Sequence, residues 1–280
     1  MTKAVLFSYF RSSSAYRVRI ALNLKKVPYE IRTVNLLQGE QSSLEFKAIS
    51  PLGAVPVLQI DGHTLTQSLA IIDYLDAMHK EPRMCPSGEP VTRSQILSLA
   101  MTMAGDMQPL HNMYTLISLT ELANADDNIK KEWIKRFLTR GFNVIEHEIA
   151  RLSENGRFCV GDSVSLADVC LAPQVYVANR FKLEMEAFPK TLGVYKNLMG
   201  LEPFITAHPH NQTDCPQELL NDLSLYFNFC LTKQVHRNFL YSTVKDKRYK
   251  DGSQDSPKRR RLRQQRGFLN GYKFSIRDIS

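Results

Sequence analysis

The most informative stretch for the fold is VPVLQIDGHTLTQS, residues 55–68. Its first six residues are typical of a buried strand, and the Asp61-Gly62 pair that follows is a two-residue hairpin turn. Residues 63–66 then form the partner strand, and residues 67–78 place apolar side chains at helical spacing. The stretch therefore predicts an antiparallel hairpin that leads straight into a helix.

The residues before this hairpin predict a strand, a helix and another strand. Residues 3–9 are an apolar strand, serines at 12–14 cap a helix, and residues 29–34 alternate like a second strand. Strands joined through a helix lie parallel. The order βαβ followed by ββα therefore predicts a four-stranded mixed sheet in a thioredoxin-like domain.

The composition changes along the chain and predicts its domains. We expect the thioredoxin-like, ligand-binding domain in residues 1–80 and a proline-rich linker in residues 81–90. Residues 91–218 carry long helical patterns, which indicate a helical bundle that contributes the substrate site. The fold class is therefore α/β followed by all-α. Residues 219–280 are polar, basic and aperiodic, which predicts a mostly disordered extension.

The overall composition excludes several classes of protein. Hydrophobic residues make up 43% of the 280, which is ordinary for a globular chain with a core. We expect no membrane association and no secretion, because the chain lacks a long apolar run and a secretory leader pattern. The five cysteines are widely spaced and never form CxxC, which argues against disulfides and a metal site. A cytoplasmic location fits these features.

The positive charge is concentrated in the extension. Residues 221–280 hold 14 of the 36 Lys and Arg and 5 of the 28 Asp and Glu, so they carry +9 and the rest carries −1. We expect nucleic acid or an import receptor to bind, if at all, only through residues 245–266. Within them PKRRRLR, residues 257–263, is similar to a nuclear-import patch. The alternative is an extension without function, such as a translated intron.

Two loops of the predicted sheet are suited to hold a peptide. Val55-Pro56 precedes the third strand, where a cis peptide bond turns the Val55 amide and carbonyl outward to pair with an extended chain. Gln67 and Ser68 open the next helix, whose free N–H groups and positive end attract a carboxylate. The alternative is that Ser68 serves only as a helix cap.

The first helix begins with RSSSAYR, residues 11–17, which offers three hydroxyls and two guanidinium groups. Both helix starts and the Val55-Pro56 loop lie at the same end of such a sheet. A thiolate placed there is stabilised by hydroxyl donors, helix N–H groups and cations. These three corners predict a groove for a small peptide thiol.

Two residues of the helical part are better explained by structure than by catalysis. Ser165-Leu166-Ala167-Asp168 has the form of a capping box, so Asp168 is expected to cap a helix. His111 lies alone beside Pro109, and we expect a packing or surface residue rather than a proton shuttle.

At several motifs the chain resembles the zeta class of cytosolic glutathione transferases, the family of the maleylacetoacetate isomerases. The resemblance covers about residues 3–218. Its motifs are FRSSSAYRVRIALNLKKVPYE, SPLGAVPVLQIDG, TQSLAIIDYL, GDMQPLHNM, VGDSVSLADVCLAPQV and NRFKLEM.

The resemblance implies glutathione as the cofactor and a set of site residues. Ser12 would stabilise the glutathione thiolate, with Ser13 and Ser14 beside it. An acidic small-molecule substrate would face Arg17 and Arg180. The remaining glutathione contacts would be Arg17, Gln41, Val55, Gln67, Ser68, Gln108 and Asn112.

The implied reaction is glutathione-dependent cis–trans isomerisation of maleylacetoacetate to fumarylacetoacetate, a step of phenylalanine and tyrosine catabolism, by transient thiolate addition. One departure matters: Ser14 and Tyr16 stand where the family usually has Cys and Trp. It leaves open a transferase that conjugates electrophiles or dehalogenates α-halo acids. A third alternative is a non-enzymatic interaction module, which the retained glutathione-site residues argue against.

The resemblance also implies a homodimer with one patch shared by both subunits. We expect its apolar contributors on the helix that holds Ile96, Leu97, Met101 and Met103, because that helix is richer in apolar residues than one bundle face requires. Ordinary core packing is the alternative.

Overall fold

Short alternating segments of the N-terminal part form one four-stranded sheet. The computed structural model describes residues 3–220. The sheet has the order β2-β1-β3-β4, in which β1 pairs parallel with β2 and antiparallel with β3. Leu6 and Leu58 face each other across β1 and β3 and are fully buried. The predicted mixed sheet is therefore confirmed. Its strands are β1 (Ala4–Ser8), β2 (Tyr29–Thr33), β3 (Val57–Ile60) and β4 (His63–Thr66).

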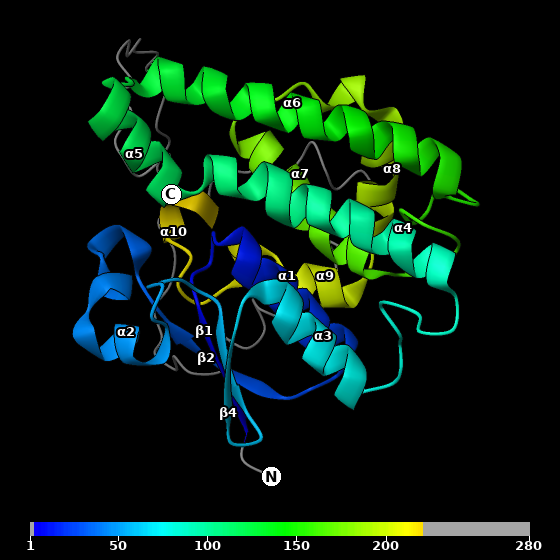
Figure 1. Cartoon of the computed structure of the whole chain (residues 1–280), viewed down its shortest axis with the longest axis horizontal. Coiled ribbons are helices and arrows are strands. Elements are labelled where there is room, and N and C mark those ends of the chain that lie inside the picture. The colour runs from blue at the N-terminus through cyan, green and yellow to red at the C-terminus, as the bar shows by residue number, and fades with distance from the viewer. Residues whose placement is uncertain (1–2, 221–280) are drawn as a thin grey trace, which may run out of the picture. The chain divides into compact units, whose positions relative to one another are not determined.

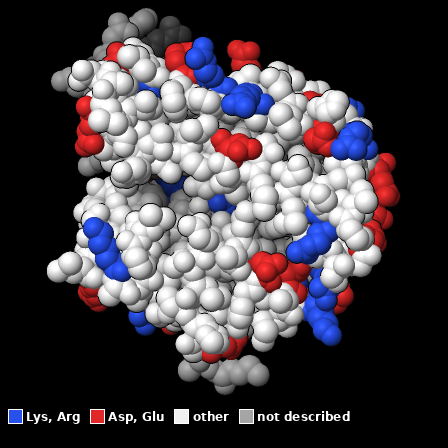
Figure 2. Space-filling model, viewed as in Figure 1, with Lys and Arg blue, Asp and Glu red and all other residues white. Residues whose placement is uncertain are grey.

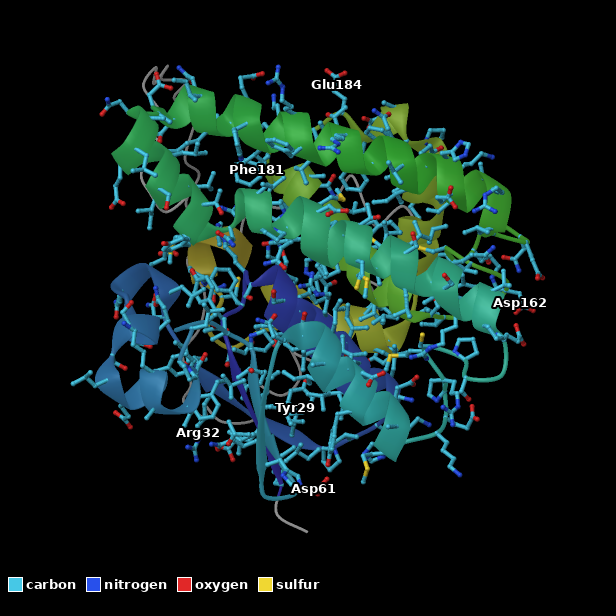
Figure 3. All side chains as sticks on the ribbon, in the orientation of Figure 1. Tyr29, Arg32, Asp61, Asp162, Phe181 and Glu184 are labelled. Atoms are coloured by element: carbon cyan, nitrogen blue, oxygen red, sulfur yellow. The ribbon has the colours of Figure 1, made fainter. Side chains whose placement is uncertain are left out.

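The turn between β3 and β4 is the two-residue hairpin that the sequence predicts. Asp61 and Gly62 have φ angles of 51° and 81°. Two successive residues in the left-handed region match the twist of a tight hairpin, and glycine adopts that region without steric cost. Figure 3 shows Asp61 at the tip of this hairpin, pointing away from the helical layer.

Three helices complete the N-terminal domain. Ser12 caps the first of them, because its hydroxyl accepts a hydrogen bond from the Ala15 amide at 3.2 Å. The first and third helices pack on each other, whereas the short second one follows two 3₁₀ turns after β2. These helices are α1 (Ser13–Leu24), α2 (Leu44–Ile49) and α3 (Ser68–Met78).

The rest of the described chain is helical. Figure 1 shows the sheet and α2 in the lower half, the long helices α4 and α6 in the upper half, and α1 between them. Helix α7 is buried along nearly its whole length, and α1 packs against both α7 and α9. A π-helical turn, η3 (Thr102–Met107), and a 3₁₀ turn, η4 (Gln108–His111), separate α4 from α5. The helices are α4 (Pro90–Met101), α5 (Met113–Ala123), α6 (Asp127–Leu152), α7 (Leu166–Arg180), α8 (Pro189–Leu198), α9 (Glu202–Ala207) and α10 (Gln217–Leu220).

The capping box predicted at the start of α7 is present. Asp168 Oδ2 accepts from both the amide and the hydroxyl of Ser165, each at 2.8 Å. Its Oδ1 accepts from the Cys159 amide at 2.8 Å. The carboxylate thus ties the loop before α7 to the helix start, which confirms the structural interpretation of this residue.

The apolar side chains expected at a subunit interface do not share one surface. Ile96 and Met103 are 3% and 0% exposed, so they belong to the core of the subunit. The expectation that these two side chains contribute to a subunit interface is therefore wrong. Leu97 is half-buried and Met101 is 56% exposed. Ile96 and Met101 belong to α4, whereas Met103 lies in the π-helical turn that follows, where the change of helical period presents a different face.

Residues 221–280 of the extension lie outside the described part of the chain, and so do the predictions made for them, including the patch at residues 257–263. Within residues 3–220, no helix combines the length and the apolar composition needed to cross a bilayer.

Candidate active site

The start of α1 brings the serine run to the end of the sheet. The Ser12 amide donates to the Tyr9 carbonyl at 3.0 Å, which closes a turn between β1 and α1. Ser12 Oγ is held in place by the Ala15 amide, and the O–H proton remains available for a further acceptor. Ser13 is 9% exposed, whereas Ser12 and Ser14 are half-exposed.

A buried arginine joins three elements around this helix start. Arg17 Nε donates to Ser68 Oγ at 3.1 Å, and its Nη2 donates to Ser14 Oγ at 3.0 Å and to Gln108 Oε1 at 2.7 Å. Ser14 Oγ in turn donates to Gln108 Oε1 at 3.0 Å. These bonds connect α1, the start of α3 and η4 of the helical layer. They bring together four of the residues that the resemblance assigned to glutathione.

Arg17 itself is 2% exposed, and burial lowers the pKa of its guanidinium. Its Nη1 is buried and has no hydrogen-bond partner among residues 3–220. A buried donor without a partner is costly, which makes this nitrogen a position for a ligand oxygen. Arg17 is therefore buried behind the helix start, and its expected contact with an acidic substrate stays a prediction.

The loop before β3 has the backbone expected for peptide binding. The Val55-Pro56 bond is cis, as the sequence predicts. Gln67, which precedes α3, has a φ of 65°, a region that costs energy for a residue with a side chain and is typical of functional sites. Its neighbour Ser68 is 5% exposed and held by Arg17, so it is more than a free cap.

Gln41 lies in the 3₁₀ turn Glu40–Ser42, beside Gly53 of the loop that leads to Val55. Its Nε2 donates to the Leu36 carbonyl at 3.3 Å, while its Oε1 is buried with no hydrogen-bond partner in the described chain. Gly53 has a φ of 63°, and a Cβ there would lie 2.8 Å from the Gln41 carbonyl oxygen. Glycine therefore allows this turn to approach the Val55 loop.

Asn112 and His111 both have structural roles in the helical layer. Asn112 caps α5 through a 2.8 Å bond from the Thr115 amide. His111 Nε2 lies 3.1 Å from Gln174 Oε1, and burial lowers the pKa of the imidazole to about 4. The ring is therefore neutral near pH 7 and packed in the core, which agrees with the packing interpretation.

Arg11 and Arg180 act on the same two tyrosines, a relation that the sequence did not predict. Burial raises the pKa of Tyr9 and of Tyr176, while the charges of Arg11 and Arg180 oppose that rise at both hydroxyls. The two guanidinium groups contact the rings of Phe10, 5.3 Å from Arg11 Cζ, and of Phe181, 4.9 Å from Arg180 Cζ. Arg11 directly precedes the serine run, which is the signal that points to it.

Ser14 and Tyr16, which stand where the family usually has Cys and Trp, lie in different surroundings. Ser14 belongs to the Arg17–Gln108 network described above. Tyr16 is fully buried, with its ring centroid 6.5 Å from that of Tyr176 and 5.9 Å from that of His208. The Tyr16 difference is thus a change in the core behind the site.

The surface is hollowed between the two layers of the molecule. Figure 2 shows an opening in this face with Lys or Arg atoms at its bottom. No group of three or more His, Cys, Asp or Glu side chains placed for a metal ion occurs in the described part of the chain.

A thioredoxin-like domain with a polar helix start, followed by a helical layer, defines a glutathione transferase. The glutathione S-transferase N-terminal domain family matches residues 3–77, and the C-terminal domain family matches residues 118–202. Maleylacetoacetate isomerase of Dictyostelium discoideum is 43% identical over 214 residues, which are 76% of this chain and 96% of the relative.

Two solved structures narrow the class. A bacterial maleyl pyruvate isomerase of the zeta class superposes with a TM-score of 0.74 at 33% identity, covering 76% of this chain and all of that one. Maleylacetoacetate isomerase of Methylobacterium extorquens AM1, with bound malonate and glutathione, has a TM-score of 0.71 at 35% identity, covering 76% and 99%. The chain belongs to the glutathione transferase family, in the zeta class of the maleylacetoacetate isomerases.

Proposed function

We propose that the chain catalyses the glutathione-dependent cis–trans isomerisation of maleylacetoacetate to fumarylacetoacetate. The observation that carries the proposal is the junction at Arg17, which links the serine helix start to Ser68 and to Gln108 of the helical layer. The Dictyostelium discoideum relative, 96% of whose length aligns with this chain, carries the name of that activity.

Two buried polar atoms fit glutathione. Arg17 Nη1 and Gln41 Oε1 have no hydrogen-bond partner within residues 3–220, and a peptide offers both carboxylate oxygens and N–H groups. We assign the γ-glutamyl end to Gln67 and Ser68, and the peptide backbone to Val55 and Gln41. Asn112 and Gln108 approach from the helical layer.

The thiol end belongs to the start of α1. Bound glutathione supplies a thiolate that adds reversibly to the conjugated double bond, so that the bond is free to rotate before the thiolate leaves. Ser12 donates its hydroxyl proton to the sulfur, while Ser13 and Ser14 present their first-turn amides. Arg180, with Arg11, holds the substrate carboxylates and the charge that develops between them. Arg17 acts mainly by supporting Ser68 and Ser14.

The experiment that tests this function is a direct assay. Purified protein is incubated with maleylacetoacetate with and without glutathione, and loss of the cis isomer is followed. We expect turnover only with glutathione. Activity that is absent, or that does not depend on glutathione, contradicts the proposal.

A second candidate rests on Ser14. Because this oxygen replaces the thiol that the family usually has, the enzyme is a candidate for conjugating electrophiles or displacing halide from α-halo acids. A panel of both substrate types separates the two activities. The Ser14→Cys variant, which restores the usual residue, is expected to shift the ratio toward isomerisation.

The assignment divides the chain by role. Residues 1–80 hold glutathione, residues 81–90 connect the two domains, residues 91–218 contribute the acidic-substrate contacts, and residues 219–280 are an addition to the enzyme.

We also propose a cytoplasmic homodimer. Exposed Met101, with Met78 and Val91 at 57% and 71% exposure, supports an apolar interface on α3 and α4. Binding of nucleic acid or an import receptor stays a proposal for residues 245–266 alone.

A further inference from the structure

The segment after α9 returns to the N-terminal domain. Residues 208–219, here called the C-terminal strap, are held by local bonds. Gln212 Nε2 donates to the carbonyls of Thr206 and His208, both at 3.0 Å. The Cys215 amide donates to the Gln212 carbonyl at 3.1 Å. The strap thus has a defined shape before its contacts with the active site are considered.

A carboxylate of this strap reaches the loop before the serine run. Asp214 Oδ2 accepts a hydrogen bond from the Phe10 amide at 2.9 Å, across 204 positions of sequence. Phe10 lies inside the turn that the Ser12 amide closes on the Tyr9 carbonyl. The strap therefore holds one peptide group of the turn that presents Ser12.

Arg19 holds the same turn from within the protein. Its Nη2 donates to the Phe10 carbonyl at 3.0 Å and its Nη1 to the Tyr9 carbonyl at 3.4 Å. Its Nε donates to the Ala207 carbonyl at 3.0 Å, just before the strap. Burial lowers the pKa of Arg19 to about 10, which leaves it charged at neutral pH. Arg19 therefore binds the Tyr9 and Phe10 carbonyls of this turn, while Asp214 binds the Phe10 amide.

Apolar contacts extend the grip to a second loop. Cys215 and Leu219 pack against a buried cluster that includes Phe10, Phe46 and Val55. Val55 precedes the cis proline of the peptide-binding loop. The strap therefore contacts both loops that the proposed function assigns to glutathione.

We propose that Asp214 is a positioning residue for the glutathione thiolate, an inference that rests on the proposed function of the site. Its carboxylate fixes the Phe10 amide, and through the Tyr9–Ser12 turn it sets the position of the Ser12 hydroxyl and of Arg11. Small displacements of such groups are costly, since a shift of about 1 Å lowers rates on the order of 100-fold. Asp214 itself does not touch the reacting atoms.

The test compares Asp214→Ala, which removes the acceptor, with Asp214→Asn, which keeps an oxygen in place. The control is Glu218→Ala, an exposed carboxylate of the same strap. Three quantities are measured on the full chain: kcat and KM, the thiol pKa of bound glutathione from the ultraviolet absorbance of the thiolate, and the melting temperature.

We expect Asp214→Ala to lower kcat on the order of tenfold and to raise the thiol pKa, because the donor moves away from the sulfur. Asp214→Asn should lie near the unmodified protein, and Glu218→Ala should match it. A normal thiol pKa and kcat in Asp214→Ala overturn the proposal, as does an equal loss in both Asp214 variants. An unmodified protein that binds no glutathione would instead overturn the proposed function.

Discussion

Three neighbouring serines have different surroundings, although the sequence presents them as equivalents. Ser12 Oγ accepts from a helix amide and keeps its proton available. Ser14 Oγ uses its proton on Gln108 and accepts from Arg17. Ser13 is nearly buried. Hydrogen-bond accounting at the level of single atoms therefore favours Ser12 as the donor to a thiolate.

Replacing Ser12 by alanine is expected to lower kcat/KM for isomerisation on the order of 100-fold, because a donor aimed at developing charge is lost. Replacing Ser14 by alanine should cost only a few-fold, since one ordinary hydrogen bond contributes about 1 kcal/mol. Steady-state kinetics of the two variants decide the comparison. Equal effects would transfer the donor role along the loop.

At the scale of elements, a buried ion pair fastens the connection between the domains. Lys25 Nζ lies 2.7 Å from Asp76 Oδ1, with the side chains 0% and 7% exposed. Asp76 also accepts from the amides of Met84 and Cys85, at 2.9 and 3.1 Å. The Met84 carbonyl accepts from the Leu166 amide at 2.8 Å. One carboxylate at the end of α3 thus orders the segment that leads to the helical layer.

Replacing Asp76 by alanine should lower the free energy of unfolding by about 3–5 kcal/mol, because Lys25 and two amides then lack their buried partner. The matched control is Asp73→Ala on the same helix. Asp73 is 76% exposed in a 4.0 Å pair with Arg93, so about 0–1 kcal/mol is expected. Urea unfolding measures both. Similar losses would mean that the linker is held mainly by other contacts.

At the scale of the whole molecule, the imidazoles of His111, which is buried, and of His208, which is partly buried, make stability depend on pH. Burial lowers the pKa of His111 to about 4 and that of His208 to about 3. The unfolded chain takes up protons near pH 6.5, whereas the folded chain does not until much lower pH. The stability that depends on neutral rings is therefore present above pH 6.5 and is lost as the pH falls toward 4.

We expect the free energy of unfolding to fall by about 2 kcal/mol for each of these two histidines between pH 7 and pH 5. The His111→Gln variant should have a flatter pH dependence than the unmodified protein. His63→Gln, at an exposed position on β4, should keep the original slope. Denaturant titrations at both pH values check this. An unchanged slope in His111→Gln would show that the ring takes up its proton equally in the folded and unfolded states, which contradicts a lowered pKa.

The proposed dimer gives a prediction for the extension. Because the exposed apolar side chains that support an interface belong to α3 and α4, the extension should not be needed for assembly. Sedimentation of the full chain and of a chain ending at residue 220 is expected to give two subunits in both cases. A monomeric shorter chain would place the interface in the extension.

Local patterns were enough to predict the order of the elements and two corners of the site. A two-residue turn at Asp61-Gly62, alternation in the strands and a serine cap at Ser12 are properties of residues close in sequence. The capping box at Asp168 is equally local. Such signals depend on backbone preference and short hydrogen bonds, which is why the sheet and the helix starts follow from the sequence.

Contacts between distant residues were decided only by packing. The sequence does not indicate that Arg17 is buried in a network that joins α1, α3 and η4. Ile96 and Met103 entered the core, and Asp214 reached Phe10 across 204 positions. Side-chain type tells what a residue is able to bond with. Which partner it meets depends on how the helices pack around it, and no periodicity in the sequence encodes that.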